Sequence, residues 1–504
     1  MAKFQLSPLF TEGAVLCRNK EMRLFGTAED SLALTLTLVD AAGSTLASDT
    51  LTAKDGRFCF CLPPQTAQEG CVLTLTDGQD TAMYSDIAIG DVYLASGQSN
   101  MELELQNADE GPELIPVHDN PLVRYFNVPK FARFGEDMEE ANKNARWHAV
   151  APGWAKDMSA VAYFFAMKLQ KKLNMPVGII DCYWGGTSVT CWMDEETLER
   201  TAEGQRYMAE YKQLWAGKSM EQYLAEEGAF FTGLDEWAKK ADALKKLHPE
   251  YTTKEINAEI GPCPPWNPPV GEGSPFRPDG LVHTMLERVI PATLTGVLFY
   301  QGEEDTWRTQ RYDILLSSFI LRLREQFMDQ ELPFLNVQLP MWIDGAAQED
   351  GKLWPRLRLA QQKVYRNLRN TGLAVLLDQG EFDNIHPTNK RVVGDRLYEQ
   401  ALDVIYHLPA LLSPFALQKS VQDGEMTIEL SAPVTEQGSA PALLEIADES
   451  GTFYPADYSL ERNRLILRSA QVSHPVMARY AWTDYAKVRF FGENGLPLAP
   501  FLFE

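Results

Sequence analysis

The sequence lacks the features typical of membrane proteins and of proteins that bind nucleic acids. Its 504 residues contain no apolar run of about 18 residues, so no membrane-spanning helix is expected. Lys and Arg total 46 against 70 Asp and Glu, and the net charge of −24 opposes binding to phosphate backbones and anionic lipids. The N-terminal MAKFQLSPLF has no apolar signal-peptide core. A cytoplasmic protein with a small-molecule or oligosaccharide partner is expected.

The sequence contains few cysteines, and their spacing does not indicate disulfide pairs. The seven cysteines are odd in number and form no CxxC pair, and Cys59 and Cys61 are too close along an extended segment for an ordinary disulfide. Free thiols in a reducing compartment are the simplest interpretation. No His, Cys and carboxylate cluster has metal-ligand spacing, so neither a metal nor a cofactor is predicted.

What is present is an α/β pattern between two β-rich ends. Residues 1–86 alternate between apolar and polar and are broken by Asp-Gly turns, which indicates β structure. From 87 to 410, short apolar runs alternate with helix-period segments, which predicts a parallel sheet with helices on both faces. The strands are expected at 89–95, 177–183, 294–300, 334–339 and 373–377, and the helices at 159–173, 312–327, 354–368 and 388–406.

Two further segments interrupt or follow this pattern. Residues 194–260 are charged and helix-rich, which indicates a helical insertion, and a lid is one role open to it. Residues 261–278 hold too much Pro and Gly for regular structure and are expected to form a loop. Residues 411–504 return to short strands, and we expect this C-terminal β segment to pack with the N-terminal one.

Polar clusters stand where four predicted strands end. They are SGQSNM (96–101), WGGTS (184–188), QGEED (301–305) and DNIHP (383–387). Because open α/β sheets carry their sites at the carboxyl ends of the strands, these clusters are expected to form one site.

The clusters contain the parts of a serine hydrolase. Ser99 needs an adjacent base to act as a nucleophile, and His386 is the one histidine that follows a strand end with an aspartate, Asp383, three residues before it. The N–H groups of Ser99 and Gly186, with the side chain of Asn100 or Gln301, are candidates for an oxyanion hole. Taken singly, each motif is more often an ordinary turn, so the prediction depends on their occurring together.

The motifs GQSNM, WGGTSVTCWM, YQGEED and DNIHPTNK resemble the four blocks of the SGNH hydrolase superfamily, and within it the sialate O-acetylesterase-like group and related carbohydrate acetylesterases. The segments LSPLFTEGAVLCR, SPFRPDGLVHTML and RYAWTDYAKVRFFGENGLPLAPF resemble the same group, so all but the insertion is covered. The resemblance implies a three-layer, flavodoxin-like α/β hydrolase domain flanked by β segments.

The resemblance also assigns roles. Ser99 takes the place of the nucleophile, His386 of the base and Asp383 of the acid, and Glu303 matches a glutamate that related acetylxylan esterases use as a helper acid. The third block commonly ends in asparagine, whereas this chain has Asp305, whose carboxylate would repel an oxyanion. The oxyanion-donor role is therefore expected to move to Gln301.

The function expected is removal of O-acetyl groups from a sugar through an acetyl-enzyme, with O-acetyl sialic acid and acetylated mannan or xylan fragments as equal candidates. Gln98, Trp184 and Trp307 are expected to contact substrate, and Arg277 or Arg308 would meet a sialate carboxylate. Two alternatives remain open. One is a non-catalytic sugar-binding protein on a hydrolase scaffold, and the other is a lipid or general short-chain esterase.

Overall fold

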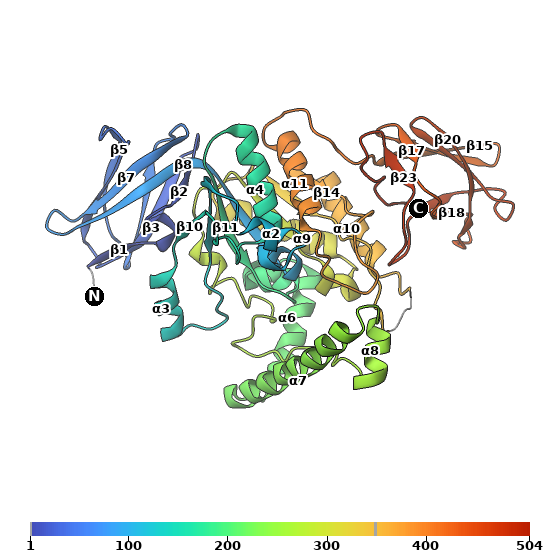
Figure 1. The fold of residues 1–504 in the computed structure, drawn as a ribbon, viewed down its shortest axis with the longest axis horizontal. Helices are drawn as coiled ribbons and strands as arrows, with labels where there is room; N and C mark the ends of the chain where they lie inside the picture. The colour runs from blue at the N-terminus through green and yellow to red at the C-terminus, as the bar shows by residue number, and fades with distance from the viewer. Residues whose placement is uncertain (1–2, 347–349) are drawn as a thin grey trace.

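A computed structural model describes residues 3–346 and 350–504, and it has a mixed α/β fold, as predicted (Figure 1). Its central sheet has the strand order β10-β9-β11-β8-β12-β13-β14, with β10 antiparallel to β9 and the other neighbours parallel. The strands are β8 (Thr81–Gly97), β9 (Asn120–Asn127), β10 (Trp147–Val150), β11 (Val177–Tyr183), β12 (Gly296–Tyr300), β13 (Phe334–Val337) and β14 (Thr371–Ala374).

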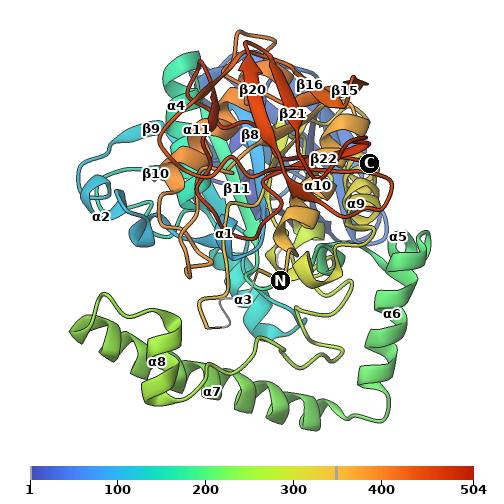
Figure 2. The same cartoon turned by 90° about the vertical axis from the view of Figure 1, so that its right-hand side faces the viewer.

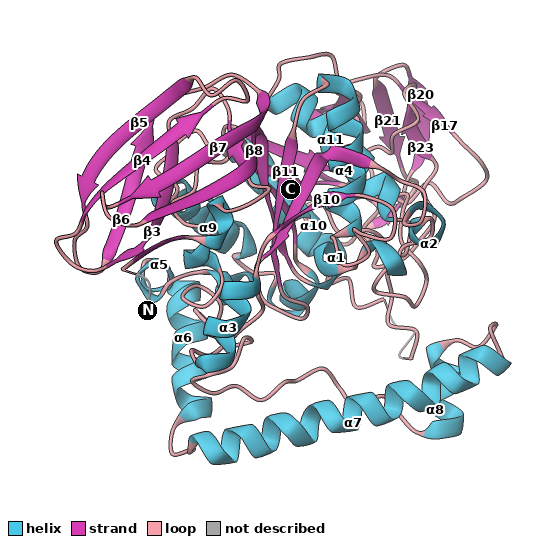
Figure 3. Cartoon of the chain, turned by 60° about the vertical axis from the view of Figure 1, so that its left-hand side comes forward, coloured by secondary structure: helices cyan, strands magenta, loops and turns pink. Residues whose placement is uncertain are grey.

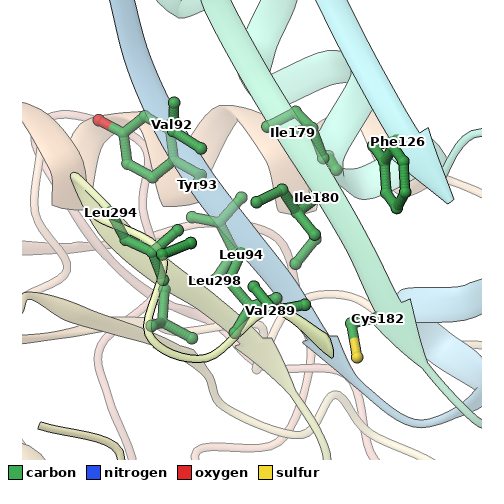
Figure 4. Packing of buried hydrophobic residues seen from close by; sticks show 14 of the residues in the cluster. Val92, Tyr93, Leu94, Phe126, Ile179, Ile180, Cys182, Val289, Leu294 and Leu298 are labelled. Atoms are coloured by element: carbon green, nitrogen blue, oxygen red, sulfur yellow. The ribbon is translucent and has the colours of Figure 1, made fainter. Parts of the chain in front are cut away.

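The middle of this sheet is buried on both faces. Every residue of β11 and β12 is buried, which is why these strands appear in the sequence as continuous apolar runs. Leu94, Ile180 and Leu298 come from three neighbouring strands and pack together in the core (Figure 4). The strand ends are therefore rigid supports for whatever follows them.

Helices pack on both faces. Tyr93 of β8 contacts Phe165 of α4 (Ala160–Leu173), whereas Phe299 of β12 contacts Phe319 of α9 (Tyr312–Gln326). Phe299 pairs in register with Ser96, three residues beyond Tyr93, so the two contacts lie on opposite faces. Helix α11 (Lys390–Val404) packs beside α4, and α10 (Trp354–Asn367) packs beside α9.

The N-terminal β unit is continuous with the central sheet. Strand β8 begins in this unit and runs through the expected boundary at residue 86 into the site region. The other strands of the unit are β1 (Phe4–Leu6), β2 (Val15–Cys17), β3 (Met22–Ala28), β4 (Ala33–Val39), β5 (Thr45–Thr52), β6 (Arg57–Leu62) and β7 (Gln68–Thr76).

The C-terminal β unit lies at the other end of the molecule from the N-terminal unit (Figure 1). The expectation that the two units pack together is therefore wrong. Its core joins Leu373, Val375 and Leu377 at the edge of the central sheet. Alternating strands specify that one face is buried but not which partner buries it. Its strands are β15 (Ala416–Gln422), β16 (Glu425–Leu430), β17 (Val434–Glu436), β18 (Leu444–Ala447), β19 (Tyr454–Pro455), β20 (Asp457–Glu461), β21 (Arg464–Arg468), β22 (Met477–Tyr480), β23 (Phe490–Gly492) and β24 (Phe501–Phe503).

The segment 194–260 consists of helices, as predicted, and much of it stands away from the body of the protein (Figures 2 and 3). Helix α7 begins with a capping box between Ser219 and Gln222, and the Pro- and Gly-rich residues that follow the insertion contain no helix or strand. The four helices are α5 (Glu195–Glu199), α6 (Ala202–Trp215), α7 (Met220–Leu247) and α8 (Thr253–Ile260).

Some elements were not predicted from the sequence. They are the strands β9 and β10 and the helices α2 (Gly111–Leu114) and α3 (Glu136–Asn144). The two strands extend the central sheet beyond β11. In the part of the chain that the structure describes, no helix is both long enough and apolar enough to cross a membrane.

Candidate active site

A pocket of about 760 Å³ opens where β8, β11 and β12 end. Ser99 begins the short helix α1 (Ser99–Glu102) just after β8, Gly186 follows β11, and Glu303 follows β12. His386, from the loop between β14 and α11, lines the same pocket. Residues from all four predicted strand-end clusters therefore line one cavity, as expected from parallel strands whose carboxyl ends share an edge.

Gly97 determines how Ser99 is presented. Its φ is +136°, and a Cβ there would lie 2.1 Å from the carbonyl oxygen of Tyr300 on β12. Only glycine fits this approach, and the turn is fixed by a hydrogen bond of 3.0 Å from Gln98 N to Tyr300 O. Ser99 is thereby left half-buried at the pocket wall.

Ser99 and His386, 287 residues apart, form a hydrogen bond of 2.8 Å between Oγ and Nε2. The ring of His386 is partly exposed to the pocket, but the surrounding protein displaces water from it. This desolvation, reinforced by the nearby Lys390 ammonium, lowers the pKa of His386 to about 4. At neutral pH the imidazole is therefore uncharged and able to accept the serine proton.

Asn100 joins the loop of Ser99 to the loop of His386. Its side-chain Nδ2 donates to the backbone oxygen of Ile385, next to His386, at 2.9 Å, and to Glu303 Oε1 at 2.5 Å. Both amide hydrogens are thus already bound to acceptors of the protein. The structure therefore does not present Asn100 as the oxyanion donor that the sequence suggested.

Beneath Asn100 lies a buried pair of opposite charges. Lys390 Nζ donates to Asn100 Oδ1, and Lys390 is 1% exposed. Burial lowers the pKa of Lys390 to about 7, opposed by the carboxylates of Glu303 and Glu381, and burial raises the pKa of Glu303. Glu303 Oε2 has no hydrogen-bond partner among the described residues. Glu303 is thus held in the site through Asn100.

Asp383 is not directed at His386. Its Oδ2 accepts a hydrogen bond of 2.8 Å from Thr253 N at the start of α8, so the insertion holds the carboxylate predicted to orient the base. No hydrogen bond between Asp383 and His386 occurs in the described residues. The DxxH spacing leaves the direction of the aspartate open, because a loop residue can turn to either side.

The side chains of Gln301 and Asp305 form a buried layer behind the pocket. Gln301 Nε2 donates to Asp305 Oδ2 at 2.6 Å, to Thr187 O and to Gln98 Oε1, so Gln301 is not available as the predicted oxyanion donor. Asp305 also accepts from Ser188 Oγ at 2.7 Å, from the Val189 backbone and from the Tyr207 hydroxyl. The Asp305 carboxylate is therefore turned away from the pocket, and in that position it would not repel an oxyanion.

Backbone N–H groups remain for an oxyanion. Those of Ser99 and Gly186 have no acceptor among the described residues, whereas Gly185 N donates to Glu102 Oε2 at 2.6 Å. Gly186 has a φ of +71°, and a Cβ there would lie 2.1 Å from Trp266 Cζ2. Two of the predicted donors thus lie at the pocket. Ser99 is placed there by the turn after β8, and Gly186 by the turn after β11, on which Trp266 packs.

The predicted substrate residues divide into two groups. Trp184 and Gln98 line the pocket, although Gln98 Oε1 also accepts hydrogen bonds from the backbone of Gly302 and Glu304. Trp307 is 56% exposed and does not line the pocket. Arg277 also lies outside it, because its guanidinium donates to the backbone oxygens of Glu272 and Pro278.

Other lining residues were not assigned to substrate binding from the sequence, although Trp266 is one of several tryptophans in predicted strand-end loops. Phe231 of α7 and Trp266 and Phe276 of the following loop contact one another and form an aromatic wall, named here the insertion wall. Lys130 and Arg133 come from the loop after β9. Phe276 lies in the quoted segment SPFRPDGLVHTML, but no motif marks the other residues, since the positions of their loops depend on tertiary packing.

Comparisons with known proteins agree with the resemblance seen in the motifs. Residues 276–403 match a family model described as carbohydrate esterase, sialic acid-specific acetylesterase. The chain is 25% identical over 461 residues to sialate O-acetylesterase of Mus musculus, covering 84% of this chain and 79% of that protein. It is 23% identical over 459 residues to the Homo sapiens enzyme of the same name, covering 84% and 76%.

A solved structure extends the likeness to the whole fold. A carbohydrate acetylesterase from Xanthomonas citri superposes with a TM-score of 0.77 and 26% identity, covering 99% of both chains. The predicted resemblance is confirmed, and the enzyme class that these relatives share is that of the carbohydrate esterases.

Proposed function

We propose that this carbohydrate esterase is a serine hydrolase that removes O-acetyl groups from sugars through an acetyl-enzyme intermediate. The observation that carries the proposal is the 2.8 Å hydrogen bond between Ser99 Oγ and a neutral His386 at the wall of a 760 Å³ pocket. A nucleophile hydrogen-bonded to a base within a substrate-sized cavity is the arrangement that acyl transfer requires. The strand order and the helices on both faces support the three-layer SGNH arrangement.

The chemistry follows in two halves. Ser99 Oγ attacks the acetyl carbonyl carbon while its proton passes to His386 Nε2, and the tetrahedral intermediate collapses as His386 returns that proton to the departing sugar oxygen. Water then attacks the acetyl-serine, His386 takes its proton, and acetate leaves as Ser99 Oγ is reprotonated. The N–H groups of Ser99 and Gly186 stabilise the oxyanion in both halves, and each such donor contributes about 3 kcal/mol.

Of the two candidate acids, we assign the supporting role to Glu303. It acts through Asn100, which binds the backbone beside His386, and so fixes the distance between base and nucleophile. Asp383 is bound to α8 and contributes to the position of the loop rather than to the charge of the imidazole.

The insertion wall and Trp184 suit a sugar ring, because aromatic faces pack against the C–H face of a pyranose. The seven cysteines are all free, which supports the predicted cytoplasmic location. An enzyme there would act on free sugars or imported oligosaccharides.

The test is acetate release from a panel of O-acetyl sialic acid, acetylated mannan and xylan oligosaccharides and a chromogenic acetate ester. The panel is run with the wild type, with Ser99→Ala and with Ser420→Ala in the C-terminal β unit as a matched control. We expect release by the wild type and the control, and loss of about 10⁴-fold or more in Ser99→Ala. No release from any member, or full activity in Ser99→Ala, would overturn the proposal.

A further inference from the structure

The pocket holds more acidic than basic groups. The acidic residues that line the pocket are Glu102, Glu227, Glu303 and Glu304. Among the described residues, the basic side chains that line it are Lys130, Arg133 and His386. His386 is neutral at neutral pH, and Lys390 lies beneath the pocket rather than in its wall. An incoming anion could therefore be neutralised only by Lys130 or Arg133.

Both of these cations already have a carboxylate partner within the pocket. Lys130 Nζ forms an ion pair with Glu102 and lies 4.9 Å from the centre of the Trp184 ring. Arg133 Nη2 lies 3.3 Å from Glu227 Oε2, and its guanidinium lies over the Tyr223 ring. A paired cation has little attraction left for a second carboxylate.

The two remaining acids of the pocket, Glu303 and Glu304, reinforce this lack of a free counter-charge. Glu304 is half-buried beside Trp266, and burial, with the nearby Asp305 carboxylate, raises the pKa of Glu304 to about 8. Glu303 is buried at the floor. When ionised they repel an anion, and when protonated they give it no counter-charge.

The arginines expected to bind a sialate carboxylate are engaged elsewhere. Arg277 donates to two backbone carbonyls, and Arg308 pairs with Glu210 while stacking on the rings of Tyr207 and Trp307. Neither lines the pocket.

We propose that the pocket selects uncharged O-acetylated sugars and discriminates against those whose sugar ring carries a carboxylate, with the Arg133–Glu227 pair as a determinant of that choice. This inference rests on the proposed function. The insertion wall binds the ring, and every pocket cation is already neutralised. A sugar carboxylate would lose its hydration and gain no unpaired partner, which is unfavourable in a partly enclosed site.

The experiment compares two substrates that differ in charge alone. They are the methyl glycoside of 9-O-acetyl-N-acetylneuraminic acid and the same compound with its carboxylate replaced by a carboxamide. Acetate release gives kcat/KM for each. We expect the wild type to prefer the carboxamide by at least about tenfold, equivalent to about 1.4 kcal/mol.

A variant tests the role of the ion pair. Glu227→Gln leaves Arg133 without its carboxylate partner. The preference for the carboxamide should then narrow by about threefold or more, because kcat/KM for the charged substrate rises. The control is Glu226→Gln, one residue earlier on α7, whose carboxylate pairs with Lys218 at 2.6 Å and does not line the pocket.

The outcomes are distinguishable. Equal use of both compounds, or preference for the free acid, by an enzyme that hydrolyses the chromogenic acetate would overturn this inference and leave the proposed function standing. If Glu227→Gln changes the preference for the carboxamide no more than the control Glu226→Gln does, the Arg133–Glu227 pair is not a determinant of that preference. Failure on every ester, the chromogenic one included, would remove the proposed function and this inference with it.

Discussion

The floor of the pocket and its insertion side are built differently. The floor consists of Ser99, Glu303 and His386, and Asn100 and Lys390 lie beneath it. Ser99 and Glu303 follow parallel strands, Lys390 begins a helix packed on the sheet, and hydrogen bonds join Ser99 to His386 and Asn100 to Glu303, Lys390 and the backbone beside His386. On the insertion side, Phe231 and Trp266 are 38% and 43% exposed, and they come from a helix and a loop outside the sheet.

The difference indicates a division of labour. In the proposed mechanism, the groups that transfer the proton are held by the sheet or tied to it by hydrogen bonds, whereas the groups proposed to select a substrate come from segments outside the sheet. Variants of the floor should change kcat, and variants of the insertion side should change KM. Four substitutions test this contrast.

The largest effect is expected for His386→Ala. Without a base, Ser99 keeps its proton, so kcat should fall by about 10⁴-fold while substrate affinity changes little. Steady-state kinetics on the chromogenic acetate measure this. His283→Ala is the control, since His283 is an exposed residue that pairs with Glu287. A loss of less than about tenfold would show that another group serves as base.

Next is Lys390→Met, which removes the buried charge beneath Asn100. Asn100 Oδ1 and Glu303 lose their cation, so kcat should fall by about 10²-fold with KM nearly unchanged. Lys390 lies over the ring of Tyr300. The matched control is Lys168→Met, since Lys168 lies over the ring of Tyr398 but is partly exposed and pairs with Asp395 of α11, away from the pocket. Equal kinetics in the two variants would contradict a positioning role.

The pH dependence of Lys390→Met provides a second test. As the proposed base, His386 must be neutral to act, so kcat/KM should fall as the pH drops through its pKa, and the wild-type acid limb is expected near pH 4. The Lys390 ammonium helps to lower that pKa, so Lys390→Met should move the acid limb to higher pH. A merely structural role would reduce the rate without moving the limb.

The sequence could predict the floor better than the insertion side. Ser99 and His386 were found because strand-end position and residue type together limit the candidates, and parallel strands bring such ends together whatever their separation in the chain. Lys390 was not found, since a lysine at a helix start is usually solvated and its burial depends on packing. Strand β9 begins with Asn-Pro and lacks alternation, which hid it from a periodicity search.

For Trp266→Ala the expected effect is smaller and falls on KM. Removing this ring from the insertion wall should raise KM for an acetylated oligosaccharide by about tenfold, and should leave kcat for a small chromogenic acetate within about twofold. Trp154→Ala, at an exposed ring outside the pocket, is the control. A fall in kcat on both substrates would show that Trp266 also holds Gly186 in place, as their packing allows.

The smallest effect is expected for Asp383→Asn, and it bears most directly on the contrast. Asparagine keeps an oxygen that can accept from Thr253 N, so the loop should hold its position and kcat should fall by less than about threefold. Glu303→Gln, run in parallel, should cost more, because it removes the charge that balances Lys390. If Asp383→Asn instead approaches the loss of His386→Ala, the aspartate must leave α8 and turn to the imidazole in the reacting enzyme. The insertion would then take part in the chemistry itself, and the division between floor and wall would fail.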